Sequence, residues 1–228
     1  MIFSTKPSRR ETLWGGIYLI LYISVLPLAL PLGLILVFPQ LDEAQINFIY
    51  FTVNFAATTV IFRKYLIQSF LDATRVPFFT LWYAVLSYLG SIMLGGMVVS
   101  GIVQVYPEFM SVNDNAIGAM VQQNYALMAI GAVILAPVTE ELLFRGLIFR
   151  GLYDRSPFVA HALSMVLFSL IHVSGYIGMY DWKLLFFCFL QYLVPAYCLN
   201  FAYRQSGNLL APILMHMATN LVSLSAMR

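Results

Sequence analysis

Three short segments of this sequence place ionisable side chains inside otherwise apolar stretches. The first holds Glu140, Glu141 and Arg145, the second holds His172, and the third holds His216. A charge at the centre of a membrane helix costs at least about 2.5–3.5 kcal/mol on insertion scales, so such residues face the protein interior and are functional by default. A lone histidine or a single Glu–Arg pair is common in helix packing. Such packing roles account for every member of the set except one acid, Glu140. We therefore interpret the set as a functional site.

Helical spacing divides the two glutamates into different roles. Glu141 and Arg145 are four residues apart with the acid first, so they share a helix face and can pair. Glu140 points about 100° away around the same helix. We expect Glu141 to be a structural acid and Glu140 to be the free acid, available as a general base. Pro137 precedes them and is expected to kink the helix, opening space for water beside Glu140.

The histidines lie in two other apolar stretches. His216 and Asn220 are four residues apart and share a face. Asn220 has three candidate roles: orienting the imidazole, binding the substrate backbone, or donating to a developing oxyanion. At helical rise, Glu140, His172 and His216 lie about 15, 21 and 12 Å from the cytoplasmic ends of their stretches. These depths are similar, so the three side chains are able to converge.

The elements that must position these residues are membrane helices. Of 228 residues, 61% are hydrophobic and 10% are charged, whereas a soluble domain carries about a quarter charged residues. The mean hydropathy is +0.84. Seven apolar runs approach the roughly 20 residues that span a bilayer. The runs are Leu13–Phe38, Ile46–Phe62, Phe78–Val103, Tyr125–Phe149, Phe158–Ile177, Leu184–Tyr203 and Leu209–Ala226. The predicted fold class is all-α, a polytopic membrane helical bundle of about seven to eight transmembrane helices, the eighth arising if Pro137 splits the fourth run.

Lysine and arginine residues indicate how the bundle lies in the membrane. If the runs alternate, most cations fall on one side and most acids on the other. By the positive-inside rule, the N-terminus is cytoplasmic and, with seven spans, the C-terminus is outside. The predicted location is the cell membrane, as a multi-pass protein of the bacterial plasma membrane. The net charge of +2 is too small, and the cations too scattered, to indicate a nucleic-acid partner.

The chain is predicted to form a single membrane domain over residues 1–228. Residues 11–124 supply N-terminal helices without a motif, and residues 125–228 supply the core that carries the ionisable set. The first apolar run exceeds the 7–15 residues of a signal-peptide core, so we expect it to be a retained helix.

The ionisable residues and their surroundings resemble a known family. The sequence has Glu-Glu-x-x-x-Arg at 140–145, Phe-x-x-x-His at 168–172 and His-x-x-x-Asn at 216–220, with matching residues at 136–146 and 207–209. This pattern is similar to that of the CPBP (Abi) family, which includes type II CAAX prenyl endopeptidases and bacteriocin-processing and immunity proteins. The resemblance covers about the second half of the chain, and no key position departs from it.

The resemblance implies an intramembrane endopeptidase acting on a membrane-associated protein or peptide. Glu140 would activate water, assisted by His172, while His216 and Asn220 would stabilise the oxyanion or orient the water. Glu141 and Arg145 would hold the site together. The family has been described both as zinc metalloproteases and as metal-free glutamate peptidases. Glu140, His172 and His216 offer a zinc ligand set with an open water position, but they lack the compact His-Glu-x-x-His motif. We favour the metal-free mechanism and expect no other cofactor.

Two other functions compete with the peptidase. One is a non-catalytic immunity protein or sensor partner on the same scaffold, and the other is a small transporter with a buried proton path. The intact acid and histidine set disfavours the first, and the lack of paired inverted repeats disfavours the second. The sequence does not indicate an oligomeric state. The motifs of other intramembrane proteases, Gly-x-Ser-x-Gly, Gly-x-Gly-Asp and His-Glu-x-x-His, do not occur.

Overall fold

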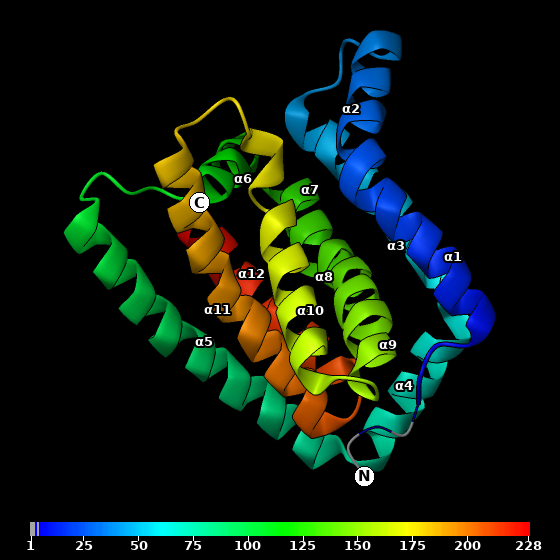
Figure 1. The fold of residues 1–228 in the computed structure, drawn as a ribbon. Coiled ribbons are helices and arrows are strands. Elements are labelled where there is room, and N and C mark those ends of the chain that lie inside the picture. The colour runs from blue at the N-terminus through cyan, green and yellow to red at the C-terminus, as the bar shows by residue number, and fades with distance from the viewer. Residues whose placement is uncertain (1–2, 4) are drawn as a thin grey trace.

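A computed structural model describes residue 3 and residues 5–228, and this part of the chain is an all-α bundle without β-strands. Its helices are drawn in Figure 1. The α-helices are α1 (Arg9–Ile20), α2 (Leu26–Val37), α3 (Glu43–Ile61), α4 (Arg63–Arg75), α5 (Pro77–Val105), α6 (Val112–Gln123), α7 (Tyr125–Ile130), α8 (Ala136–Glu140), α9 (Arg150–Tyr153), α10 (Pro157–Ile171), α11 (Trp182–Ser206) and α12 (Leu210–Ala226). Three π-helical segments, η1 (Leu21–Val25), η2 (Gly131–Leu135) and η3 (Glu141–Phe149), and a 3₁₀ turn, η4 (Ser174–Tyr176), complete the set.

Helix ends follow ordinary capping chemistry. At the starts of five helices a serine or aspartate side chain accepts a hydrogen bond from the first turn, which satisfies one of the free backbone N–H groups there. These N-caps are Ser8, Asp42, Ser111, Ser156 and Asp181. Helix α11 ends at Gly207 in the left-handed conformation, with φ of 73°. This residue type allows the sharp reversal before α12, which starts three residues later.

Each of the seven predicted apolar runs forms helix, but the helices differ in length. Four are long and apolar enough to cross a membrane: Glu43–Ile61, Pro77–Val105, Tyr125–Tyr153 and Trp182–Ser206. The first run makes a fifth span if Arg9–Ser24 and Leu26–Val37, bent by 63°, count as one. The remaining two runs form the shorter helices Pro157–Ile171 and Leu210–Ala226. Length and composition thus support four or five spans, and the count of seven to eight stays a prediction.

The fourth run is the central helix of the bundle. Segments α7, η2, α8, η3 and α9 follow one another without a break, so Pro137 does not split the run into two spans. In its most apolar window 67% of the residues are buried, against 17–33% in the other three long helices. Helices α3, α10 and α12 pack against it. Glu140, Glu141 and Arg145 therefore lie on the most deeply buried of the long helices.

The N-terminal helices form an arm beside this core. Helices α1 and α3 run side by side and α2 extends away from the bundle, as Figure 1 shows. Helix α2 has no buried residue. At the opposite side, α5 packs against α11 and α12. The arm joins the bundle through α3, which packs against α7, η2 and α8, and through α1, which packs against η3.

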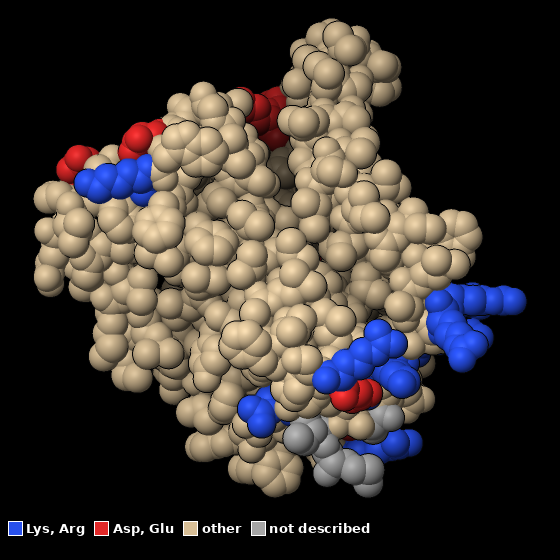
Figure 2. Space-filling model, viewed as in Figure 1, with Lys and Arg blue, Asp and Glu red and all other residues tan. Residues whose placement is uncertain are grey.

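Charges gather at the two ends of the molecule. Lys and Arg gather at the lower end in Figure 2, which is called the basic end below. Most of the acidic atoms in view lie at the upper end, called the acidic end, where a smaller cationic group is also present. The N- and C-termini also lie toward opposite ends (Figure 1). This arrangement agrees with the charge alternation read from the sequence, while the orientation in a membrane remains a prediction.

Candidate active site

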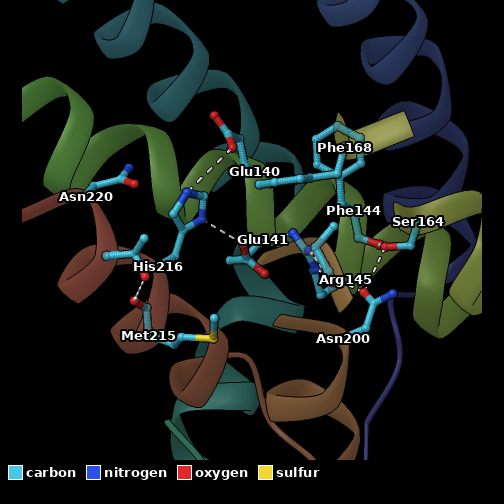
Figure 3. A network of polar contacts seen from close by, with 12 residues as sticks. Glu140, Glu141, Phe144, Arg145, Ser164, Phe168, Asn200, Met215, His216 and Asn220 are labelled. Atoms are coloured by element: carbon cyan, nitrogen blue, oxygen red, sulfur yellow. Dashed lines mark hydrogen bonds and ion pairs between the residues drawn. The ribbon is translucent and has the colours of Figure 1, made fainter. Parts of the chain in front are cut away.

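Two carboxylates and one imidazole form the centre of the candidate site. The His216 Nδ1 atom lies 2.9 Å from Glu141 Oε1, and its Nε2 atom lies 3.9 Å from Glu140 Oε2. Figure 3 shows the imidazole of α12 between the two adjacent glutamates of the central helix. The first distance is a hydrogen bond, whereas the second is too long for one. Neighbouring glutamates thus reach opposite edges of one histidine ring.

Glu141 and Arg145 form the ion pair that their spacing predicted. Arg145 Nη1 donates to Glu141 Oε1 at 3.0 Å, and both side chains are fully buried. The other guanidinium nitrogens are also used, because Nε donates to Asn200 Oδ1 and Nη2 donates to the Ala196 carbonyl, each at 3.1 Å. The guanidinium carbon lies 4.4 Å from the centre of the Phe168 ring. A buried charge is tolerated when it is paired and hydrogen-bonded in this way.

Glu140 differs from its neighbour in both contacts and exposure. It is 7% exposed, and its Oε2 atom has no hydrogen-bond partner among the residues that the structure describes. Glu140 lines a cavity of about 1040 Å³ that also reaches His172, His216 and Asn220. Glu141 also leaves its Oε2 atom unbonded within the described part of the chain, so the two acids differ in that Glu141 is ion-paired and fully buried whereas Glu140 lines the cavity. The assignment of a structural role to Glu141 and a reactive role to Glu140 stays a prediction.

His172 lies in the same cavity but away from the carboxylates. It follows the last residue of α10, where its Nδ1 is 2.8 Å from the Phe168 carbonyl. Its ring stacks on Tyr192, with centroids 4.3 Å apart. The Phe168 ring contacts both imidazoles, at 4.7 Å from His172 and 5.7 Å from His216. The structure thus links the two histidines through an aromatic ring and not through a direct contact.

Asn220 makes a contact that its sequence spacing did not predict. Its Nδ2 donates to the Ala132 carbonyl at 2.7 Å. In the π segment before Pro137, the Ala136 N–H donates to Gly131, five residues back. The next N–H in that register would belong to residue 137 and would reach Ala132, but proline has none. Asn220 therefore satisfies a carbonyl that Pro137 leaves without a donor.

The hydrogen bonds define what the two imidazoles offer. A carbonyl oxygen only accepts, so the His172 bond requires its proton on Nδ1. The paired carboxylate of Glu141 likewise accepts from Nδ1 of His216. In both rings Nε2 is then free for a second partner. A free carboxylate beside such an imidazole can take a proton from water and pass it on.

The residues present do not assemble a zinc site. Among the described residues, no three His, Cys, Asp or Glu side chains lie close enough together to hold a metal ion. The suggested ligand set of Glu140, His172 and His216 is therefore not brought together. Only Glu140 and the Nε2 atom of His216 approach each other, and a catalytic zinc needs three protein ligands.

Several residues of the site were not identified from the sequence. Asn200 and Ser164 are both fully buried. The Oδ1 atom of Asn200 accepts from Arg145 Nε and also from the Ser164 hydroxyl, at 3.0 Å. Tyr22 and Tyr50 of the N-terminal arm stack at 6.3 Å and line the cavity with Glu140. The sequence held one indication of Asn200, which is one of two amide side chains, with Gln191, inside an apolar run. The tyrosines left none, because tyrosine is common throughout these helices.

Part of the chain is similar in sequence to known proteins. Residues 122–222 match the family described as type II CAAX prenyl endopeptidase Rce1-like. The chain is 32% identical over 95 residues to the UPF0177 protein YxdF of Lactococcus lactis, covering 42% of this chain and 47% of that protein. It is 32% identical over 111 residues to the putative membrane peptidase YdiL of Bacillus subtilis, covering 48% of this chain and 41% of that protein.

The matches are confined to part of each protein. The chain spans under half of the length of these two curated relatives. No solved structure matches it significantly. The matched segment contains all six predicted site residues, namely Glu140, Glu141, Arg145, His172, His216 and Asn220. The resemblance read from the three motifs is confirmed, because residues 122–222 match the family described as type II CAAX prenyl endopeptidase Rce1-like.

Proposed function

We propose that this protein is an intramembrane endopeptidase in which Glu140 is the general base. The observation that carries the proposal is the position of Glu140, which lines a large cavity beside an imidazole held by Glu141 and Arg145 and has one carboxylate oxygen without a hydrogen-bond partner among the described residues. The Rce1-like match and the similarity to YdiL, named a putative membrane peptidase, support the same class.

The proposed reaction is addition of water to the scissile carbonyl. Glu140 removes a proton from a water molecule in the cavity, and the oxygen forms a bond to the carbonyl carbon. The carbonyl π electrons move to oxygen and give a tetrahedral oxyanion. The carbon–nitrogen bond then breaks, and the proton held by Glu140 passes to the leaving amine. The reaction is balanced, because the water supplies both the oxygen that stays on the carbonyl carbon and the proton that the leaving amine receives. No other reactant is needed.

The other polar groups are proposed to assist this reaction. His216 Nε2 is close enough to Glu140 to share a bound water or, when protonated, to donate to the oxyanion. Asn220 has one further amide N–H after its bond to Ala132, which is available to the substrate. His172 is proposed to orient water through its free Nε2. Glu141 and Arg145 are proposed to act through His216 as positioning residues.

The proposed substrate is a membrane-associated peptide or protein. The cavity opens among hydrophobic helices and includes many apolar side chains, which suits a segment partly embedded in lipid. For a bacterial protein, a leader peptide, a bacteriocin-type peptide or a membrane protein is a better candidate than a prenylated tail. The bacterial plasma membrane is the proposed location, in keeping with the bacterial relatives.

The decisive experiment is a comparison of peptide N-termini in cells carrying the native chain or Glu140→Gln. A general base contributes about 10²–10⁴-fold to rate, so the variant should lose termini that the native chain produces. Glu108→Gln is the matched control, because that glutamate is exposed and does not line the cavity. Both variants should accumulate to the native level in the membrane. Identical profiles at equal protein levels under several growth conditions would instead favour a non-catalytic immunity or partner protein.

A further inference from the structure

The cavity of the candidate site reaches only one end of the molecule. Besides the catalytic candidates, it is lined by Glu43 at the start of α3, Asp114 of α6, Tyr176 of η4 and Met227 after α12. These segments all lie at the end opposite the N-terminus, where Figure 2 shows acidic atoms in the hollow between arm and bundle. Access to Glu140 is therefore through the acidic end.

The basic end is closed by buried contacts. The Tyr65 and Tyr203 hydroxyls lie 2.6 Å apart and join α4 to α11. Glu11 of α1 accepts the Tyr65 backbone N–H at 2.9 Å. Phe149 at the end of η3 is fully buried there. None of the lysines or arginines at this end lines the cavity. The cavity therefore does not extend to the basic end.

The cavity carries only negative formal charge. Its charged lining residues are Glu43, Asp114 and Glu140, and no Lys or Arg lines it. Clefts lined by one sign of charge attract ligands of the opposite sign. No described cation forms an ion pair with Asp114 or Glu43. The unpaired charge is thus complementary to a basic group of a ligand.

Asp114 is held in a defined position beside the candidate site. The Tyr192 hydroxyl donates to its Oδ1 at 2.7 Å, and Asn113 donates to that hydroxyl at 3.0 Å. Gln191 Nε2 is 3.4 Å from Oδ2, and the Gln191 Oε1 atom is buried without a described partner. The Tyr192 ring stacks on His172 at 4.3 Å. A group bound at Asp114 would therefore lie one side chain away from the catalytic candidates.

We propose that the substrate reaches the site from the extracytoplasmic face and presents a basic side chain or free amino group to Asp114. This inference rests on the proposed peptidase function and on the orientation that places the basic end in the cytoplasm. Asp114 supplies the carboxylate, and Gln191 Oε1 supplies a second acceptor for the same N–H group. Apolar residues of the substrate would occupy the remainder of the cavity. The substrate class is an exported or outward-facing membrane peptide with a basic residue near the cleaved bond.

The access side is tested by cysteine labelling in intact cells. Cys188 and Cys198 are buried and are first replaced by alanine. Thr219→Cys then reports the cavity, since Thr219 lines it close to His216, and Arg155→Cys reports the exposed basic end. A membrane-impermeant maleimide should label Thr219→Cys in intact cells and Arg155→Cys only after permeabilisation. The reverse pattern would overturn the proposed access side. This outcome does not depend on any proteolytic activity.

The role of Asp114 is tested on the cleavage sites found in the Glu140→Gln comparison. Hydrogen bonds to charged groups are worth enough to change rates by about tenfold. Asp114→Asn, which keeps an acceptor for Tyr192, should reduce cleavage about tenfold at sites with a neighbouring Lys, Arg or free amino group. Asp114→Glu and the exposed-acid control Glu108→Gln should retain it. Equal loss at basic and neutral sites, or no loss, would refute this role. If Glu140→Gln changes no termini, the peptidase function itself fails, and the labelling result still decides the access side.

Discussion

Two adjacent glutamates have different environments because only one of them can reach Arg145. Glu141 Oε1 is bonded by Arg145 and His216, whereas Glu140 makes no ion pair closer than 3.9 Å and lines the cavity. A buried ion pair adds little stability by itself, but removing one partner leaves an uncompensated charge. The structural and the reactive acid should therefore respond differently to the same Glu-to-Gln change.

We expect Glu141→Gln and Arg145→Ala to destabilise the protein by about 3–5 kcal/mol, because each leaves a buried charge unpaired. Glu140→Gln should change stability by no more than about 1 kcal/mol, since the carboxylate makes no ion pair closer than the 3.9 Å contact with His216 and glutamine keeps its size and one oxygen. Thermal unfolding of the purified protein in detergent measures all three. A Glu141→Gln variant with native stability and full activity would show that our division of roles is wrong.

Zinc removal should leave the proposed activity unchanged. The ligand atoms nearest to forming a zinc site are Glu140 Oε2 and His216 Nε2, and no third ligand joins them among the described residues. Purified protein should contain far less than one zinc per chain by elemental analysis. Peptidase activity that falls with a chelator and returns with added zinc would contradict the proposed mechanism.

At the scale of the element, the π-helical segment before Pro137 connects the central helix to α12. The proline removes a donor for the Ala132 carbonyl, and Asn220 supplies one at 2.7 Å. Such segments occur often at functional sites. A proline in a membrane helix is tolerated where a neighbouring side chain satisfies the freed carbonyl. The segment thereby orients the amide of Asn220, which would otherwise be able to rotate.

Pro137→Ala should preserve or raise stability, by up to about 3 kcal/mol, because alanine restores an N–H and suits a helix interior. Proteolysis should nevertheless fall about tenfold if the amide of Asn220 is released, the loss expected for one misplaced hydrogen bond. Asn220→Ala should cost about 1–3 kcal/mol in the native background, since it leaves the Ala132 carbonyl unbonded. A double-mutant cycle measures the coupling. Full additivity of the two changes would argue against this connection.

At the scale of the whole molecule, charge asymmetry and the lipid-facing surface decide how the bundle lies. Large apolar side chains are exposed along α2 and α5, which suits contact with lipid. Basic residues gather at one end and the cavity reaches the other (Figure 2). The two termini lie toward opposite ends (Figure 1), as an odd number of crossings requires.

We expect a reporter fused to the C-terminus to lie outside the cytoplasm. Alkaline phosphatase should be active there, whereas green fluorescent protein should be dark, because each reporter folds in only one compartment. Green fluorescent protein at the N-terminus should fluoresce. A fusion after Arg155, at the basic end, is the matched internal control and should also report the cytoplasm. A fluorescent C-terminal fusion would contradict the predicted orientation.

Local patterns in the sequence determined the positions of the helices and one contact within the site. Apolar runs located every membrane-related helix, because burial in lipid requires continuous helix. The Glu141–Arg145 pair followed from i,i+4 spacing, which depends on a single helix. The count of spans was less secure, since α10 and α12 have only 15 and 17 residues. Their ability to cross a membrane depends on their surroundings.

Only the tertiary structure decided which side chains meet across helices. It bonded His216 to Glu141 and placed it 3.9 Å from Glu140, brought Asn220 to the Ala132 carbonyl and placed His172 against Tyr192. It also brought Tyr22 of the motif-free arm to the cavity. No spacing rule predicts such contacts, because they depend on how far each helix is shifted and rotated against its neighbours. Those shifts come from the packing of many side chains along each helix and not from the few residues that carry the chemistry.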